Sequence, residues 1–304
     1  MRRKAGELVR QDRGYDAFIP YPLPPEIMYD DELHFLLSKA DAALARLDGV
    51  TEVLPNSDIF VAMYVKKEAL LSAQIEGTQV SLQGVLEFEA NLKPKEDIRD
   101  IREVINYIRA LNSGIDQLQK GDLNLALINE SHKTLITGTR GSDKNPGRYK
   151  DKQNFLGTAG GTIFQASFIP PPPEKIEQLM IDLEKFIQEK DRLPVLIKTA
   201  LIHAQFETIH PYLDGNGRMG RLLIAIQLRE QQILPQPLLY LSAYFEQQQD
   251  AYRDLMLRVS THGDWKSWID FFLTGVHRQS VETLETSQHL LDLREVMHEW
   301  AHSV

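Results

Sequence analysis

The sequence contains no cysteine, which excludes a disulfide framework and a zinc site built from thiolates. Any bound metal would therefore be held by oxygen or imidazole ligands. No apolar run reaches the length of a membrane span. The basic N-terminus, MRRKAGELVR, is not followed by the apolar stretch of a secretory signal. We therefore expect a soluble, cytoplasmic protein without a membrane partner.

Positive charge is also scarce, because 34 lysines and arginines face 43 aspartates and glutamates and the formal net charge is -9. Non-specific nucleic-acid binding needs a basic surface, so this balance argues against it. A nucleotide bound at a local basic site remains compatible with it. With 304 residues, of which 42% are hydrophobic, the chain can form one large domain or two small ones with an ordinary core.

Helical periodicity dominates the chain from residue 31 onward, and it predicts a mainly helical protein. The clearest amphipathic segments are 58–75 and 97–118. Further helices are expected at 123–136, 174–189, 195–209, 218–231, 247–259, 264–277 and 281–302. Near the N-terminus, the prolines from Pro20 to Pro25 forbid a helix and predict an extended arm on the surface over residues 1–30.

The segment 145–175 departs from this pattern. Two short β-prone runs, at 155–156 and 162–164, flank the glycine-rich turn TAGG and predict a β-hairpin. The polyproline run at 170–173 ends it. A single hairpin has no core of its own, so we expect it to lie as a flap on the helical body.

The stretch ETIHPYLDGNGRMGRLL, at 207–223, holds the strongest functional signal. Pro211 ends the preceding helix, which places His210 at its C-terminus. Gly215 and Gly217 supply the backbone freedom for a sharp turn. Because a helix follows at once, its unpaired N–H groups and positive dipole end form an anion site.

The charged residues of this stretch indicate the chemistry. Arg218 and Arg221 beside the turn suit a diphosphate or triphosphate. Asp214 is the carboxylate of the turn, and next to phosphates it is a plausible ligand for Mg²⁺. His210 is a base with a pKa near neutrality. The combination predicts phosphoryl or nucleotidyl transfer to an acceptor whose proton His210 removes.

Other interpretations of the stretch explain less. The glycines satisfy the dinucleotide fingerprint G-x-G-x-x-G, but a helix precedes them in place of a strand. A calcium-binding EF-hand loop fails because Arg218 and Ala225 stand at positions that need oxygen ligands. A purely structural turn would explain the glycines but not the histidine, the aspartate and the arginines together. We expect His203, seven residues earlier, to be a packed or surface histidine.

The stretch HPYLDGNGRMGR, at 210–221, resembles the motif of the Fic (Fido) family, His-Pro-Phe-x-Asp/Glu-Gly-Asn-Gly-Arg-x-x-Arg. Every specified position matches except Tyr212, which replaces a phenylalanine that packs in the family. The resemblance extends over about 55–280. The pattern GRYK…NFLG…FIPPPP is similar to the family's flap, and GDWKSWIDFFLTGV at 263–276 is similar to its closing helix.

This resemblance implies an all-α, Fic-type helical bundle with one small β-hairpin flap. The implied domains are an N-terminal arm and helix at 1–57, a Fic core with a preceding inhibitory helix at 58–280, and a C-terminal helix at 281–304. The implied reaction is AMPylation, in which AMP moves from ATP to a tyrosine, threonine or serine hydroxyl of a target protein docked at the flap. Pyrophosphate is released, and Mg²⁺ is the implied cofactor.

The resemblance also implies a role for each matching residue. His210 would be the general base, and Asp214 would hold Mg²⁺ between the α- and β-phosphates. Backbone and amide donors of residues 215–217 would form the anion nest, while Arg218 and Arg221 would bind the β- and γ-phosphates. Tyr252 would lie near the adenine. The implied nucleotide-binding set is Asp214, Gly215, Asn216, Gly217, Arg218, Met219, Gly220, Arg221, Tyr252 and the flap residues Asn154, Phe155, Leu156 and Gly157.

A second motif lies upstream, in LLSAQIEGTQVSL at 70–82. Taken alone, Glu76 and Gly77 read as an ordinary helix C-terminus. However, Ser72-x-x-x-Glu76-Gly77 resembles the family's inhibitory motif, whose glutamate pairs with the second arginine, here Arg221. A carboxylate in an anion site competes with the anion, so the resemblance implies inhibition within one chain.

Three functions stay open on the sequence: an adenylyltransferase inhibited by Glu76, an enzyme that removes AMP with the help of Glu76, and a regulatory module that binds nucleotide and catalyses little. Some members of the family transfer other phosphate-containing groups. Relatives often pair as homodimers, which makes a second copy a candidate partner. We expect no nucleic-acid partner for this chain, and the sequence does not identify the target protein.

Overall fold

The computed structural model describes residues 5–50, 57–158 and 160–303. Outside the described residues lie 1–4, at the start of the predicted arm, and 51–56, near the end of the first predicted domain. Residue 159, in the predicted flap turn, and residue 304 also lie outside them. Within the described part there are eleven α-helices and one two-stranded sheet. The expectation of an all-α fold is therefore confirmed.

The helices run in the order α1 (Asp31–Val50), α2 (Ser57–Ile75), α3 (Leu82–Glu89), α4 (Ile98–Leu118), α5 (Leu125–Ile136), α6 (Pro173–Gln188), α7 (Val195–Ile209), α8 (Asn216–Glu230), α9 (Leu241–Gln247), α10 (Gln249–His262) and α11 (Trp265–Ser303). Several begin at side-chain caps: Ser81 accepts from Gly84 N before α3, and Asn124 accepts from Leu127 N before α5. The short helices α3 and α9 were absent from the sequence-based prediction.

The N-terminal segment is extended, as predicted, but it is more than an arm on the surface. Strands β1 (Gly6–Arg10) and β2 (Asp16–Pro20) pair as an antiparallel hairpin. Phe18 is buried, and its backbone N–H donates to Ile169 O at 2.9 Å. The hairpin thus closes against the C-terminal part of the predicted flap segment.

Helices α7 and α8 form the centre of the molecule. Almost every residue of both helices is buried, as expected for helices covered on all sides. Helices α2, α4 and α5 pack against α8, and α6, α10 and α11 pack against α7. The Trp268 indole donates to Ala200 O at 2.8 Å and so ties α11 to α7. The loop that joins the two central helices, 210–215, is the first half of the motif at 210–221.

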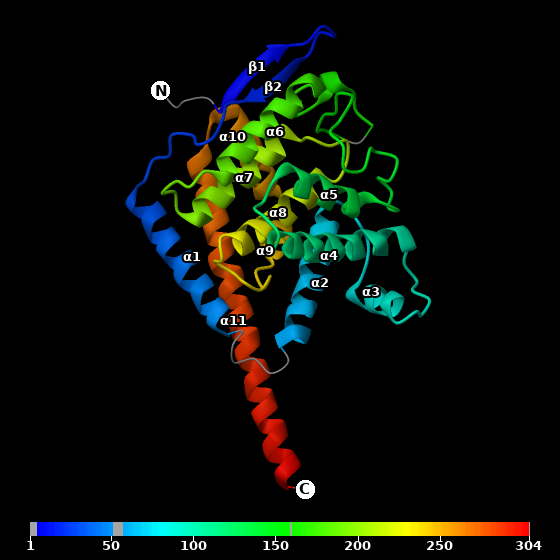
Figure 1. The fold of residues 1–304 in the computed structure, drawn as a ribbon, viewed down its shortest axis with the longest axis vertical. Coiled ribbons are helices and arrows are strands. Elements are labelled where there is room, and N and C mark those ends of the chain that lie inside the picture. The colour runs from blue at the N-terminus through cyan, green and yellow to red at the C-terminus, as the bar shows by residue number, and fades with distance from the viewer. Residues whose placement is uncertain (1–4, 51–56, 159, 304) are drawn as a thin grey trace.

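The C-terminal part corrects the prediction of two helices at 264–277 and 281–302. A single helix of 39 residues, α11, covers both, and the domain boundary predicted after residue 280 falls inside it. The intervening residues are Arg278, Gln279 and Ser280, which include no helix breaker, and the last two are buried. In Figure 1, α11 runs along the molecule beside α1 and its C-terminal end extends past the other helices.

The predicted flap hairpin is also corrected in part. The two runs at 155–156 and 162–164 form no ladder, and Ile163–Gln165 is a short 3-10 helix. An isolated antiparallel bridge joins Leu156 to Phe168, with Leu156 N donating to Phe168 O at 2.8 Å. The segment is therefore an irregular loop closed at its base. Among the described residues, no helix combines the length and apolarity that crossing a membrane requires.

Candidate active site

His210 occupies a special backbone position at the end of α7. Its φ of 51° and ψ of 60° place it in the left-handed region, which is uncommon for a residue with a side chain. Its Nδ1 lies 3.3 Å from Glu207 O. A carbonyl only accepts, so this contact places the ring proton on Nδ1 and leaves the Nε2 lone pair available to accept a proton.

The surroundings of His210 hold it in the neutral form. Burial lowers the pKa of His210, the charge of Lys150 lowers it further, and the resulting pKa is about 4. The imidazole is therefore an unprotonated acceptor at pH 7.

The turn after His210 is closed by Asn216. The side chain of Asn216 accepts from Tyr212 N and donates to Tyr212 O, both at 2.9 Å, and it is buried. Gly215, with φ of 78°, makes the corner. The Asn216 side chain thus holds the turn, while its place in the anion nest stays a prediction.

His132 on α5 supports the same turn. Its ring stacks on Tyr212, with 3.5 Å between centroids and 4° between planes. Its Nδ1 accepts from Gly147 N at 3.0 Å, so Nε2 carries the proton and donates to Asp214 O at 2.9 Å. Sequence reasoning missed His132, because one buried histidine on an amphipathic helix carries no distinctive pattern.

Asp214 has the features of a ligand for Mg²⁺. Its side chain is 42% exposed, and Oδ1 accepts from Gly215 N at 2.6 Å. Oδ2 lies against Gly141, where an added Cβ would come within 2.4 Å of it. No cluster of three or more metal-binding side chains occurs in the described ranges. A single carboxylate completed by phosphate oxygens and water is nevertheless the usual way in which proteins hold Mg²⁺.

Arg218 forms an ion pair with a carboxylate on α4. Its Nη1 lies 3.2 Å from Glu103 Oε2, and both side chains are buried. Thr78, just after the upstream motif, donates to the same Glu103 oxygen at 2.6 Å. Arg218 Nε is buried and has no hydrogen-bond partner among the described residues. Glu103 is a further residue that the sequence did not reveal.

Arg221 is held by the end of α2 through its Nε and Nη2. Its Nη2 donates to Glu76 Oε1 at 2.7 Å and to Ser72 O at 2.9 Å, and its Nε donates to Ser72 Oγ at 2.9 Å. Burial alone would raise the pKa of Glu76, but Arg221 outweighs it and the pKa lies below its ordinary value. The two motifs, 145 residues apart in the sequence, thus meet directly.

Glu76 also lies on the first turn of α8. A Cβ added to Gly217 would come within 2.2 Å of Glu76 Oε1. The carboxylate therefore occupies the position at the helix N-terminus where the sequence predicts an anion. Gly77 follows with φ of 88° and ends the segment, as expected for a residue after a helix.

A second carboxylate, Glu207, lies on the other side of the same turn. Its Oε1 would be 2.3 Å from a Cβ on Gly220, and it has no hydrogen-bond partner within the described chain. Burial raises the pKa of Glu207 to about 7, although the charge of Arg221 lowers it. Sequence reasoning overlooked Glu207 as a group of the site that titrates near neutrality, and its place inside the motif stretch is the signal that could have found it.

Three further residues singled out in the sequence, His203, Tyr252 and the motif residue Met219, face the core. His203 is buried, stacks on Trp268, and contacts Gly220 O at 3.0 Å and the Tyr252 hydroxyl at 2.8 Å, which fits the expected packed histidine. Tyr252 is itself buried, so its place near the adenine stays a prediction. Met219 is buried and its N–H bonds Gly215 O at 3.0 Å, so both its side chain and its N–H are engaged within the protein.

The flap residues divide into two groups. Asn154 contacts the motif, because its Nδ2 donates to Tyr212 O at 2.9 Å and its Oδ1 accepts from Lys150 Nζ at 2.7 Å. Phe155 is half-buried, whereas Leu156 and Gly157 are exposed. The structure thus brings Asn154 to the site and leaves the next residues outward.

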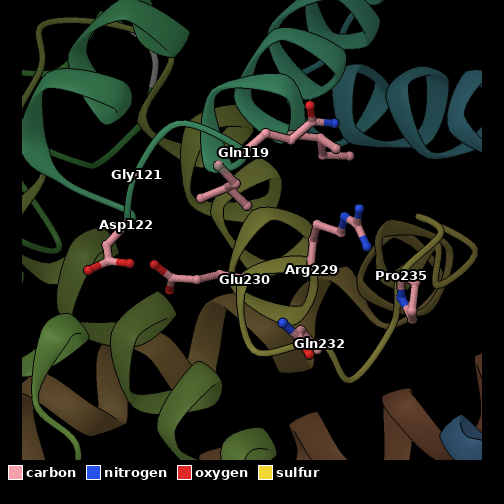
Figure 2. Close-up of a pocket in the computed structure, with 9 residues that line it drawn as sticks. Gln119, Gly121, Asp122, Arg229, Glu230, Gln232 and Pro235 are labelled. Carbon is pink, nitrogen blue, oxygen red and sulfur yellow. The ribbon is translucent and has the colours of Figure 1, made fainter.

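A separate polar cavity of about 510 Å³ lies where the C-terminal ends of α4 and α8 meet. Figure 2 shows Asp122 and Glu230 pointing toward one another on one side of it, with Arg229 directed away. Its lining shares no residue with the two motifs. The motif loop, not this cavity, is the candidate active site.

Comparison with protein families agrees with the site's geometry. A model described as "Fic/DOC family N-terminal" matches residues 34–116, and one described as "Fic/DOC family" matches residues 122–228. Together they cover more than half of the chain.

The chain belongs to the Fic family. Among curated relatives, it is 27% identical over 176 residues to a probable protein adenylyltransferase of Aquifex aeolicus, covering 58% of this chain and 51% of that protein. It is 27% identical over 208 residues to the protein adenylyltransferase Fic of Nematostella vectensis, covering 66% of this chain and 44% of that protein. The Fic chain thus spans about half the length of these relatives.

Solved structures show the same fold. A Fic family protein from Desulfovibrio desulfuricans superposes with a TM-score of 0.72 at 20% sequence identity, over 87% of this Fic chain and 77% of that chain. The Fic-1 fragment of Caenorhabditis elegans superposes with a TM-score of 0.61 at 17% identity, over 87% of this chain and 73% of that chain. At these identities the likeness establishes the fold of the Fic chain.

Proposed function

We propose that this Fic protein is a Mg²⁺-dependent protein adenylyltransferase that transfers AMP from ATP to a hydroxyl side chain of a target protein. The observation that carries the proposal is the meeting of three groups at one turn: the neutral imidazole of His210, the carboxylate of Asp214, and the α8 N-terminus with Arg221. The names of the relatives, which are protein adenylyltransferases, support the same activity.

In this proposal the target hydroxyl oxygen attacks the α-phosphorus of ATP, and its proton passes to His210 Nε2. The bond from the α-phosphorus to the bridging oxygen breaks, and pyrophosphate leaves with the electron pair. The phosphates are bound by the N-terminus of α8, Arg218 and Arg221. These groups stabilise the negative charge that develops on the pyrophosphate as it leaves. Asp214 would hold Mg²⁺, which neutralises phosphate charge when bound. Each group acts on charge that develops during transfer.

The proposal includes self-inhibition. Glu76 occupies both Arg221 and the first turn of α8, so a γ-phosphate competes with a carboxylate for the same donors. In the resting chain ATP would bind in a pose that leaves the α-phosphate out of line with the acceptor. The site is complete, but one side chain obstructs it.

Removal of AMP from a modified target is the second candidate. The Glu76 side chain is 40% exposed although it contacts Arg221, so water reaches the carboxylate. Glu76 would orient that water toward the α-phosphorus of a modified side chain. A module that only binds nucleotide is less well supported, since binding needs the arginines but not a neutral base at His210.

Target docking would use the exposed part of the flap. Leu156 is 41% exposed and Phe164 is 70% exposed, and both lie on the loop that Asn154 anchors to the turn. An extended target segment pairing with this loop would gain backbone hydrogen bonds and apolar contacts. A homodimer and a cytoplasmic location complete the proposal.

The test compares two radiolabels. The Glu76→Gly protein is incubated with lysate, Mg²⁺ and ATP labelled on either the α- or the γ-phosphate, with His210→Ala in the same background as the control. AMP transfer labels protein from α-labelled ATP only, and the His210→Ala control stays unlabelled. Label from γ-labelled ATP would show phosphoryl transfer instead. Absence of both labels, together with loss of label from a pre-modified target, would favour AMP removal.

A further inference from the structure

The N-terminal hairpin and the flap segment share an edge. In the register of β1 and β2, Leu8 lies opposite Phe18. The backbone N–H of Phe18 points away from β1, because it donates to Ile169 O at 2.9 Å. The Phe18 ring contacts the Phe168 ring, with 5.9 Å between centroids, and Phe18 is only 6% exposed. The hairpin therefore holds the flap segment through both backbone and side chain.

Phe168 and Ile169 form hydrogen bonds on opposite sides, as successive residues of an extended chain do. Ile169 accepts from β2, whereas Phe168 faces Leu156, which donates to Phe168 O at 2.8 Å and accepts from Phe168 N at 3.2 Å. Four extended stretches, which we call the flap platform, thus lie side by side in the order β1, β2, 168–169 and 155–157. In Figure 1 the hairpin lies at the same end of the molecule as the loop that carries the flap.

The outer edge of the flap platform presents its backbone groups outward. Because the N–H and C=O of Leu156 are directed toward Phe168, those of its neighbours Phe155 and Gly157 point the other way. Leu156 is 41% exposed, and Gly157 is exposed as well. An extended peptide can add to such an edge through main-chain hydrogen bonds. The position of this edge depends on Phe168, which is itself held by Phe18.

The flap platform is tied to the catalytic turn at two points. Gln205 on α7 is buried, and its Nε2 donates to Tyr21 O at 2.9 Å, immediately after β2. The same helix carries His210 at its C-terminal end. On the flap side, Asn154 Nδ2 donates to Tyr212 O at 2.9 Å. A segment added to the outer edge would thus lie at a fixed position relative to His210.

The hairpin precedes residue 34, where the region matched by the family models begins. We propose that it is a specificity-determining part of target docking: Phe18, through Phe168, fixes the exposed edge at 155–157, to which an extended segment of the target adds as a further strand. The exposed Leu156 and Phe164 on the same loop favour an apolar segment. The kinetic part of this inference rests on the proposed adenylyl transfer, whereas the structural part concerns the nucleotide-free protein alone.

The direct experiment measures amide hydrogen exchange by NMR in the nucleotide-free full chain. Phe18→Ala removes the ring that contacts Phe168, and Phe35→Ala removes a 53% exposed ring on α1, outside the flap platform, as the matched control. We expect Phe18→Ala to raise the exchange rate of the Leu156 amide by about tenfold, because one pair of aromatic rings changes a local opening equilibrium by about that factor. Phe35→Ala should leave this rate unchanged.

An internal reference separates this effect from a general loss of stability. The Lys150 amide donates to Pro211 O at 2.9 Å, at the start of the flap segment, and should keep its exchange rate in Phe18→Ala. If Phe18→Ala does not fold, Phe168→Leu replaces it, because this change removes the same ring contact from the flap side and leaves the hairpin intact.

The kinetic experiment uses the Glu76→Gly background and measures labelling of lysate proteins from α-labelled ATP. For the most strongly labelled protein, we expect Phe18→Ala to raise the lysate concentration that gives half the maximal rate by about tenfold. The maximal rate and the KM for ATP should be retained. A merely structural role would lower the maximal rate and leave the half-saturating concentration unchanged, and Phe35→Ala should behave as its Glu76→Gly parent.

An unchanged Leu156 exchange rate in a folded Phe18→Ala or Phe168→Leu protein overturns the proposal. An equal rise at the Lys150 amide overturns it too, as does a loosened flap with an unchanged half-saturating concentration. A protein that labels nothing in either background yet shows the Leu156 effect would instead contradict the proposed function and retain the structural role of the hairpin.

Discussion

Removing the Glu76 carboxylate is expected to release Arg221 and to accelerate AMP transfer. The carboxylate and guanidinium charges lie about 4 Å apart, which corresponds to about 4 kcal/mol at an effective dielectric constant of about 20. The Glu76 side chain is 40% exposed, so solvent screening and the desolvation of Arg221 reduce this to about 1–2 kcal/mol net. Because 1.4 kcal/mol is a factor of ten, we expect an increase on the order of 10-fold in the initial rate.

The assay is self-modification with α-labelled ATP at matched protein and Mg²⁺ concentrations. Glu76→Gly should show the full gain and Glu76→Gln, which keeps a hydrogen-bonding amide, a smaller one. The double variant Glu76→Gly with Arg221→Ala should be slow again, because the freed site then lacks its guanidinium. Equal labelling by wild type and Glu76→Gly would refute the reasoning.

The pH dependence of this gain follows from the sign of the pKa shift. Burial alone would raise the pKa of Glu76, but Arg221 outweighs it and the folded-state pKa lies below the ordinary value of about 4.3. The pairing is therefore fully present above about pH 4.3 and is lost as the pH falls through the lowered value. Glu76 itself therefore stays ionised between pH 6 and 8, so loss of its pairing should make the Glu76→Gly and wild-type rates converge only at acid pH.

Three further perturbations test other parts of the site. His210→Ala should lower AMP transfer by about 10²–10⁴-fold while ATP affinity, measured by calorimetry, is retained, and an undiminished rate would remove His210 from the reaction. Gly141→Ala brings a Cβ to 2.4 Å from Asp214 Oδ2 and should raise the Mg²⁺ concentration needed for half-maximal activity, with Gly121→Ala, where an added Cβ meets nothing, as the silent control. Burial raises the pKa of Glu207 to about 7, so protonation of Glu207 in the folded state makes the protein more stable at pH 5 than at pH 8. Glu207→Gln should reduce this difference in the free energy of unfolding by about 2 kcal/mol, measured by urea unfolding. An unchanged difference would contradict the raised pKa.

The motif at 210–221 could be predicted from the sequence because its glycines, Asp214 and the arginines lie close together along the chain. Taken alone, Glu76 and Gly77 indicate only an ordinary helix end, so the upstream motif was recognised through the family resemblance. The pairing of Glu76 with Arg221 came from the family resemblance and not from any spacing within the chain.

The supporting residues could not be predicted, because they reach the site from distant segments through tertiary packing. Glu103, His132 and Lys150 come from three different segments, and each alone looks like an ordinary polar residue on a helix or loop. The predictions that α11 is divided into two helices and that the flap forms two strands were wrong for a related reason. Periodicity does not show that Ser280 is buried in a continuous helix, nor that residues 163–165 turn as a 3-10 helix.

The position of Glu76 at the end of α2 has a consequence for how the proposed inhibition could be relieved. Helix α2 is part of the core, since Tyr64, Ala69 and Ala73 along it are buried. The carboxylate is therefore tethered to the site at an effective concentration that dilution cannot lower, and displacing the whole helix would amount to partial unfolding. Relief must come from rotation of one side chain or from movement of the last turn, where Gln249 on α10 holds Ile75 O at 3.0 Å. A ligand or partner that takes up this carbonyl contact would act on the reaction without entering the phosphate site.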